Sequence, residues 1–137
     1  MKIYLATPMN GRPIEDIKEK IADWASLLAK KGIDFFNPFS EAIAMDNAVD
    51  GVVEDKRPVE ILCNAAKYIE DCSSVLFIGS MDELRQSLGC QVELVIAVNY
   101  GKGFYLYDDG EIIEIESLEL TWKFSRRTKG QLRWDSD

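Results

Sequence analysis

The chain has 137 residues, of which 47% are hydrophobic and 29% charged, and this size and composition predict one ordinary domain over residues 1–137. Its formal net charge of −8 argues against duplex nucleic acid as a partner, because duplex binding depends on a basic face that neutralises phosphates. The sequence contains no histidine, which excludes Ser-His-Asp and Cys-His catalysis, imidazole general bases and His-ligated zinc.

The first predicted strand covers residues 2–6, where a short apolar run gives way to turn-forming residues at 7–13. A helix is predicted after Pro13, because apolar residues recur every three or four positions up to a basic last turn and the stop signal Gly32. A second strand is predicted over 33–36. Residues 39–57 have no clear period and are predicted to form a long loop or a broken helix, of the kind that serves as a lid or binding segment.

The second half of the chain continues the alternation of helices and strands. A helical period runs from Pro58 to about residue 69, and the continuous apolar run at 74–79 is typical of a strand covered on both faces. A loop at 80–87 is predicted to lead into a helix over 88–99. A fourth strand follows at 104–107, and a turn signal at 108–110 precedes an alternating segment at 111–115.

This order predicts an α/β fold with three layers, a flavodoxin- or Rossmann-like parallel sheet of four to five strands with an antiparallel edge strand. Residues 118–137 form a tail of uncertain structure whose five basic residues favour a solvated or subunit-contacting role over a nucleic-acid arm. The three cysteines Cys63, Cys72 and Cys90 match no CxxC or zinc spacing, so we expect buried free thiols. No apolar run is long enough for a secretion signal or membrane span, and we expect a cytoplasmic protein without membrane contacts.

Ligands of parallel α/β sheets bind beyond the carboxyl ends of the strands, which directs attention to the loops after the first and third strands. The first of these loops, Thr7 to Arg12, combines a hydroxyl, a glycine backbone and a guanidinium that suit a phosphate or carboxylate. The alternative is a turn that only caps the following helix. In the second loop, Ser87 is a good helix N-cap, and Gly89 lets a ligand approach the amino end of that helix.

Glu93 lies six residues after Ser87 among apolar neighbours on the same predicted helix. Helical geometry places it on the same side as Gly89, one turn further along, so that it can face the site entrance. A carboxylate in such surroundings is either a solvated surface residue or a held functional group, and the spacing alone leaves both open.

Three motifs distributed over residues 2 to about 107 point to a known family. They are Ile3-Tyr4-Leu5-Ala6-Thr7-Pro8-Met9 with Gly11-Arg12 after it, Asn37-Pro38 after the second strand, and Ser87-Leu88-Gly89-Cys90-Gln91-Val92-Glu93-Leu94 followed by Ala97. On these residues the chain resembles the nucleoside 2-deoxyribosyltransferase superfamily, which includes 2′-deoxynucleoside 5′-monophosphate N-hydrolases. The resemblance implies a small-molecule partner, a nucleotide or nucleoside, no metal or other cofactor, and a homodimer whose neighbouring subunit completes the site.

The resemblance also implies residue roles. Glu93 occupies the position of a glutamate that attacks the anomeric carbon and forms a glycosyl-enzyme ester, and Tyr4 matches a tyrosine that orients this carboxylate; the alternative for Tyr4 is a strand residue packed against a helix. At the position of Ser87, family nucleotide hydrolases have a serine that contacts the 5′-phosphate, which a carboxylate would repel. The residues expected to bind the substrate and its phosphate are Thr7, Met9, Asn10, Gly11, Arg12, Ser87 and Gly89.

One departure from the family concerns an aspartate on the helix before the third strand, where this chain has Ala66. Asp71 is the favoured substitute, ahead of Glu70, Glu60 and Asp55, although each of them is also a candidate surface charge. The sequence therefore predicts an N-glycoside hydrolase, or a transferase, that acts on a nucleoside 5′-monophosphate. The alternatives are a catalytically impaired nucleotide-binding or sensing module and a flavodoxin-like protein with another ligand.

Overall fold

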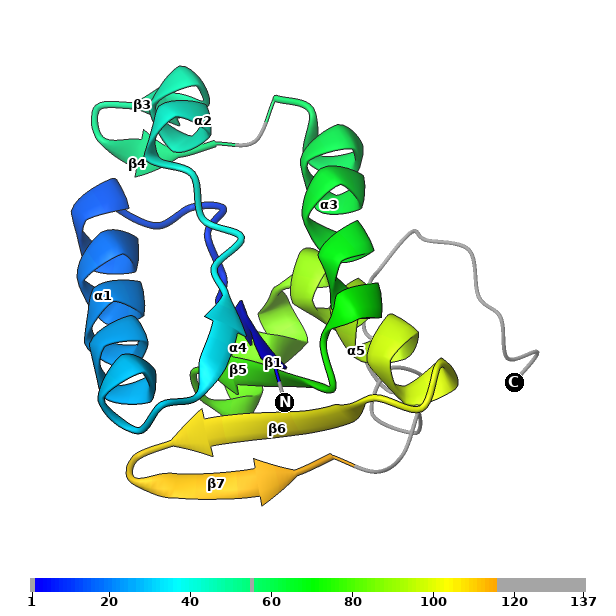
Figure 1. The fold of residues 1–137 in the computed structure, drawn as a ribbon. Helices are drawn as coiled ribbons and strands as arrows, with labels where there is room; N and C mark the ends of the chain where they lie inside the picture. Colours follow the sequence, from blue (N-terminus) through cyan, green and yellow to red (C-terminus); the bar gives the residue numbers. More distant parts are fainter. Residues whose placement is uncertain (1, 55, 116–137) are drawn as a thin grey trace.

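The computed structural model describes residues 2–54 and 56–115, and these residues form a three-layer α/β fold (Figure 1). A five-stranded sheet has the order β2-β1-β5-β6-β7, with parallel pairs except for the antiparallel pair of β6 and β7. Its strands are β1 (Lys2–Ala6), β2 (Asp34–Phe36), β5 (Ser74–Ile78), β6 (Gly103–Asp108) and β7 (Glu111–Glu114). The predicted fold class, including the antiparallel edge strand, is confirmed.

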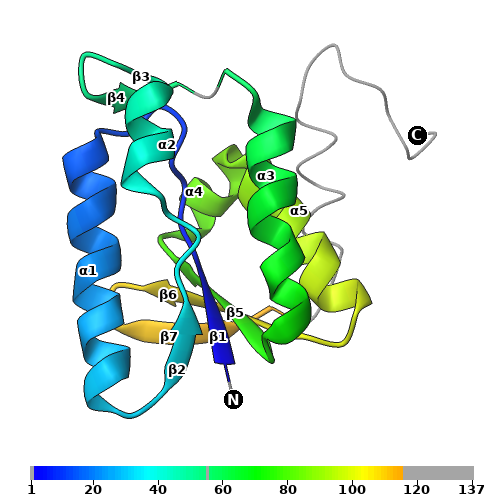
Figure 2. The same ribbon diagram turned by 45° about the horizontal axis from the view of Figure 1, so that its top comes forward.

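Helices cover both faces of the sheet, as Figure 2 shows with α1 on one side and α3 and α5 on the other. The helical segments are α1 (Ile14–Lys30), α2 (Glu41–Asp46), α3 (Pro58–Ala66), the 3₁₀ helix η1 (Lys67–Asp71), α4 (Met81–Gln86) and α5 (Leu88–Asn99). Because successive side chains of a strand point to opposite faces, β1 contributes to two cores. Leu5 packs with α1, whereas Tyr4 and Ala6 pack with α3, η1, α4 and α5.

The strand order reverses at β1, which lies between β2 and β5. The chain passes from β1 through α1 to β2 on one side, and later returns to the other side of β1 as β5. The loops that follow β1 and β5 therefore meet at the point where α/β folds open a crevice beyond their strands. This topology places the two loops singled out in the sequence next to each other.

The structure corrects two predictions about secondary structure and one about the burial of a cysteine. The segment 80–87 is a helix, α4, rather than a loop, and Ser80 and Glu83 form a capping box at its start. The stretch 39–57 contains α2 and a small antiparallel hairpin of β3 (Ala48–Val49) and β4 (Val52–Val53). Cys63 is exposed, because it lies on the outer side of α3, while Cys72 and Cys90 are buried as predicted.

Two segments for which the sequence suggested a role, the tail 118–137 and Asp55, lie outside the described residues. Across residues 2–54 and 56–115, no helix has both the length and the apolar character that a membrane crossing requires.

Candidate functional site

Glu93 is a buried carboxylate in the middle of α5, with 7% of its surface exposed. Helix α5 packs against α3 and against the sheet face that carries Tyr4, where it contacts β6. The inward side of α5 therefore faces the protein interior. Burial raises the pKa of Glu93 to about 7, although interactions with the Tyr4 hydroxyl and the Cys90 thiol act to lower it. The spacing of Glu93 left open whether its carboxylate is a solvated surface group, and its burial excludes that alternative.

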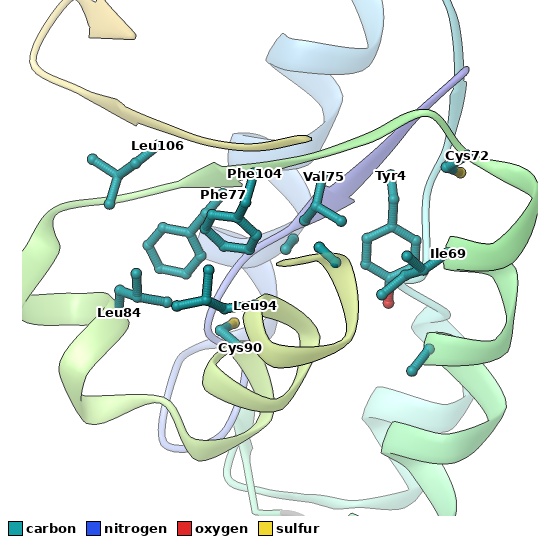
Figure 3. Packing of buried hydrophobic residues seen from close by; sticks show 13 residues of the cluster. Tyr4, Ile69, Cys72, Val75, Phe77, Leu84, Cys90, Leu94, Phe104 and Leu106 are labelled. Carbon is teal, nitrogen blue, oxygen red and sulfur yellow. The ribbon is translucent and has the colours of Figure 1, made fainter. Parts of the chain in front are cut away.

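Tyr4 reaches Glu93 from the neighbouring strand. Its ring extends from β1 between α5 and Ile69 of η1, as Figure 3 shows. The Tyr4 hydroxyl is buried and forms no hydrogen bond of standard geometry within the described residues. Burial and the nearby Glu93 carboxylate raise the pKa of Tyr4 far above its ordinary value of 10.0, so the phenol stays protonated and can donate. The polar neighbour of this hydroxyl is the Glu93 carboxylate, toward which the protonated phenol can donate.

Cys90 completes this buried cluster from the turn of α5 that precedes Glu93. Burial, followed by the charge of Glu93, raises the pKa of Cys90 well above 9.0, which keeps the thiol protonated. Tyr4, Cys90 and Glu93 thus form a buried group in which two protonated side chains adjoin one carboxylate. We call these three residues the Glu93 cluster.

An aromatic stack leads from the Glu93 cluster toward the surface. The ring of Phe36, at the carboxyl end of β2, lies 5.7 Å from the ring of Tyr4 and 4.1 Å from the ring of Tyr68, measured between centroids. Both pairs are stacked, with interplanar angles of 26° and 21°. Tyr68 is 40% exposed, and Nζ of Lys67 lies over its ring at 5.2 Å from the centroid.

The loop after β1 is anchored by the small hairpin. The Gly11 N–H donates to the carbonyl of Val53 at 2.6 Å, and the Arg12 N–H donates to the carbonyl of Met9 at 3.1 Å. The expected role of these two backbone groups in holding a phosphate is therefore not supported, because both are already bonded within the protein. Gly11 has φ +77°, which explains a glycine at this turn.

The side chains of the same loop have different surroundings. The Thr7 hydroxyl is buried and donates to the carbonyl of Ile78 at 3.4 Å, which ties the end of β1 to the end of β5. Met9 is half-buried against the α1 core, and Asn10 is exposed. Arg12 is the remaining candidate for an anion, because its side chain is half-buried and directed toward α4.

Arg12 forms an ion pair that joins the loop after β1 to the start of α4. Its Nη1 atom lies 3.0 Å from Oε2 of Glu83, and Nζ of Lys20 lies 3.9 Å from the same oxygen. The other oxygen, Oε1, accepts the N–H of Ser80 at 3.0 Å. Burial acts to raise the pKa of Glu83, but the Ser80 hydrogen bond and the charges of Lys20 and Arg12 outweigh it and lower the pKa.

The amino end of α5 is built as predicted. The Ser87 hydroxyl oxygen accepts the N–H of Cys90 at 3.3 Å, which confirms Ser87 as the N-cap. A side chain at Gly89 would reach Leu62 of α3 at 3.9 Å, an ordinary contact, so packing alone does not require glycine there. Gln91 is buried and donates to the carbonyls of Leu84 and Arg85, which joins the end of α4 to α5.

Asp71 is not brought to the Glu93 cluster. It is exposed at the end of η1, before the amino end of β5, whereas the loops of the crevice follow the carboxyl ends of the strands. Glu60 and Glu70 are also exposed. Ala66, where the resemblance leads to the expectation of an aspartate, is buried in the same core as Tyr4.

Sequence reasoning assigned no role to Glu83, Gln91 or Cys90. The capping-box spacing of Ser80 and Glu83 was a usable signal for a helix start. The ion pair between Glu83 and Arg12, however, joins residues that are 71 positions apart in the chain. Cys90 and Gln91 lie inside the motif that suggested Glu93, and only the packing of α5 shows which way they point.

Comparisons of the chain with protein-family models, with curated proteins and with solved structures found no match. The arrangement of the Glu93 cluster, the aromatic stack and the Arg12–Glu83 pair is therefore the basis for a functional conclusion.

Proposed function

We propose that the protein is an N-glycoside hydrolase, or a transferase, that cleaves the bond between base and sugar of a nucleoside 5′-monophosphate through Glu93. The observation that carries the proposal is a buried carboxylate, Glu93, beside a buried and protonated phenol, Tyr4, in the core that α5 forms with the sheet. The motifs that resemble the nucleoside 2-deoxyribosyltransferase superfamily provide the same two residues, Tyr4 and Glu93, in the roles of orienting group and nucleophile.

The chemistry follows from the charge that develops on the sugar. As the glycosidic bond breaks, its electron pair leaves with the base and the anomeric carbon becomes an oxocarbenium-like cation. The ionised Glu93 carboxylate stabilises this cation and bonds to it, which gives a glycosyl ester. Water then attacks the same carbon, and the ester bond breaks with its electron pair on the carboxylate, which is restored. The proton that the attacking water loses balances the proton that the departing base takes up; in a transferase a second base takes the place of water. Donation from Tyr4 favours the ionised form of Glu93.

The raised pKa of Glu93 sets the pH range of this reaction. A carboxyl with a pKa of about 7 is only about half ionised at neutral pH, and the nucleophile must be ionised. We therefore expect the rate of base release by the free enzyme to rise with pH through about 7 and to level off above it.

The charges at the crevice support a phosphorylated substrate. Arg12 and Lys20 carry two positive charges against the single negative charge of Glu83, and Ser87 caps the start of α5 where α4, the helix of Glu83, ends. Tyr68, at the end of the aromatic stack, is 40% exposed, and Nζ of Lys67 lies over its ring at 5.2 Å from the centroid, so a nucleobase that stacks there must displace the Lys67 side chain.

The test is base release from a panel of ribo- and 2′-deoxyribonucleoside 5′-monophosphates, measured by chromatography. Glu93→Gln keeps the size of the side chain and removes the nucleophile, so we expect its rate to fall by at least about a thousandfold. The matched control is Glu19→Gln, an exposed position on α1 that makes the same chemical change away from the crevice. Equal rates for Glu93→Gln and the unaltered protein would refute the assignment.

One observation favours a second candidate function, a nucleotide-binding or sensing module without turnover. Ala66 is buried in the same core as Tyr4, and among the described residues of that core Glu93 supplies the buried carboxylate, with none at position 66. Calorimetric titration separates the two candidates, because a sensor binds mononucleotides and releases no base.

We also propose that the active form is a homodimer. Leu88 and Val92 are 60% and 41% exposed on the outer side of α5, which is a large apolar exposure for a helix close to the site. Light scattering at working concentrations tests this, and a monomer mass would contradict it.

A further inference from the structure

The strongest unassigned feature of the crevice is the carboxylate of Glu83. It lies at the start of α4, directly after β5, and is 28% exposed. Its two oxygens contact a basic group of the loop after β1, a basic group of α1 and the backbone of its own helix cap. Glu83 therefore joins the loop after β1 to α4, the helix that follows β5, and ligands of this fold bind beyond the ends of such strands.

A carboxylate in this place occupies the same basic groups that a substrate phosphate would use. Arg12 pairs with a carboxylate or a phosphate through the same N–H donors, and Nη1 of Arg12 already lies 3.0 Å from Glu83. A phosphate that reaches Arg12 and Lys20 must share them with Glu83 or replace it, and the two anions repel each other at this range. A neutral 5′-hydroxyl meets no such repulsion.

We propose that Glu83 is a specificity-determining residue that competes with the 5′-phosphate of the substrate for Arg12 and Lys20. This inference rests on the proposed function in so far as it names a nucleotide as the ligand. Glu83 holds both cations in place before binding, and its charge sets how strongly the site prefers a phosphorylated over an unphosphorylated substrate. Removal of that charge strengthens binding of the phosphate and leaves binding of the free nucleoside unchanged.

The substitution Glu83→Gln isolates the charge, because a glutamine can keep the hydrogen bond from the Ser80 N–H. The matched control is Asp82→Asn on the preceding residue, which removes one negative charge from the same turn but pairs with Arg85 instead. Both are introduced into the Glu93→Gln protein to prevent turnover. Circular dichroism and thermal unfolding establish that each variant is folded.

Calorimetry measures binding of the four 2′-deoxynucleoside 5′-monophosphates, the four 2′-deoxynucleosides and inorganic phosphate. We expect Glu83→Gln to lower the Kd of the nucleotides and of phosphate by about three- to tenfold, within the range of a partly exposed ion pair, without a change for nucleosides. Asp82→Asn should change none of them. Weaker or unchanged binding of nucleotide and phosphate in Glu83→Gln would overturn the inference.

Two outcomes separate this inference from the proposed function. If inorganic phosphate binds more tightly to Glu83→Gln but no nucleotide binds to any variant, the competition stands and the nucleotide function fails. If nucleotides bind and Glu83→Gln does not alter their Kd, only the role of Glu83 fails. Absence of any phosphate or nucleotide binding overturns both.

A second measurement uses the protein with Glu83 in place, so that the proposal can be tested even if Glu83→Gln does not fold. The NMR signal of the Arg12 side-chain N–H groups, assigned by its loss in Arg12→Lys, should shift as inorganic phosphate is added, because the phosphate takes over donors that Glu83 holds. An Arg12 signal that stays constant up to saturating nucleotide would contradict the competition.

Discussion

The unaltered chain should lose stability as the pH rises, because its buried Glu93 ionises, whereas Glu93→Gln should not show this loss. The carboxyl has an ordinary pKa of 4.5 when the chain is unfolded and a pKa of about 7 when it is buried. The folded state therefore binds this proton more tightly, so the stability that Glu93 contributes is present below pH 4.5 and is lost as the pH rises through 7. Glutamine has no proton to lose, and its contribution does not change over this range.

The size of the effect follows from the same two pKa values. At about 1.4 kcal/mol for each tenfold change in proton affinity, the free energy of unfolding of the unaltered chain should fall by about 2–3 kcal/mol relative to Glu93→Gln between pH 5 and pH 8. For a chain of this length that difference corresponds to a change in Tm of roughly 10 °C. Other titrating groups are common to both proteins and cancel in the comparison.

Urea unfolding followed by circular dichroism at pH 5, 6, 7 and 8 measures this difference. The control is Glu19→Gln, whose curve should run parallel to that of the unaltered protein, because Glu19 is exposed. Parallel curves for Glu93→Gln as well would show that Glu93 ionises as freely in the folded as in the unfolded chain, and the reasoning from burial would then be wrong.

Three further substitutions test the surroundings of the cluster. Tyr4→Phe removes the buried hydroxyl that interacts with Glu93. The pH midpoint of base release should move upward because Glu93 loses a donor, and the free energy of unfolding should change by less than about 1 kcal/mol, because this interaction falls outside standard hydrogen-bond geometry. Gln91→Ala removes two hydrogen bonds to carbonyls of α4 and should destabilise the fold by about 1–3 kcal/mol in urea. Gly79→Ala brings a methyl group to 2.9 Å from the ring of Phe77 and should cost about 1–3 kcal/mol.

Two of these substitutions have a matched control. Gln86→Ala removes an exposed glutamine side chain at the end of α4 and should change stability by less than about 0.5 kcal/mol. Gly89→Ala adds a methyl group that meets only Leu62, at 3.9 Å, so it should be neutral or stabilising within α5. A Tyr4→Phe protein with an unchanged pH midpoint, or equal effects of Gly79→Ala and Gly89→Ala, would contradict the packing described for these residues.

The periodic parts of the fold could be predicted from the sequence. The helix after Pro13 was recognised by its apolar spacing, and the buried residues Ile14, Ile17, Ile21 and Leu28 lie on its inward face. The strand at 74–78 was recognised by its continuous apolar run and is buried at every position, as expected for a strand with helices on both sides. In both cases one local pattern coincides with one layer of the fold.

Short elements were missed although local signals existed. Asp50-Gly51 is a turn sequence between two valine-containing segments, and both residues have positive φ, at 52° and 78°, so the hairpin of β3 and β4 was detectable. The Ser80-x-x-Glu83 spacing likewise marks the start of α4. These elements are only a few residues long, which is too short for a hydrophobic period that could confirm them.

The candidate site was predictable only in part, because its properties come from distant segments. The position of Glu93 followed from the motif and from helical spacing, but its raised pKa depends on burial against Tyr4, 89 positions away in the chain. Similarly, nothing local in the loop after β1 indicates that its Gly11 N–H is taken by Val53 or that Arg12 is held by Glu83. Long-range contacts decide which of the predicted groups remain open to a ligand.

The most direct test of the central claim is to trap the covalent intermediate on Glu93. The protein is mixed with each 2′-deoxynucleoside 5′-monophosphate, quenched in acid within a turnover, digested and analysed by mass spectrometry. We predict that the peptide containing Glu93 gains the mass of one deoxyribosyl 5-phosphate group, and that the Glu93→Gln protein gains none. Release of free base at the same rate by both proteins, with no modified peptide in either, would contradict the account.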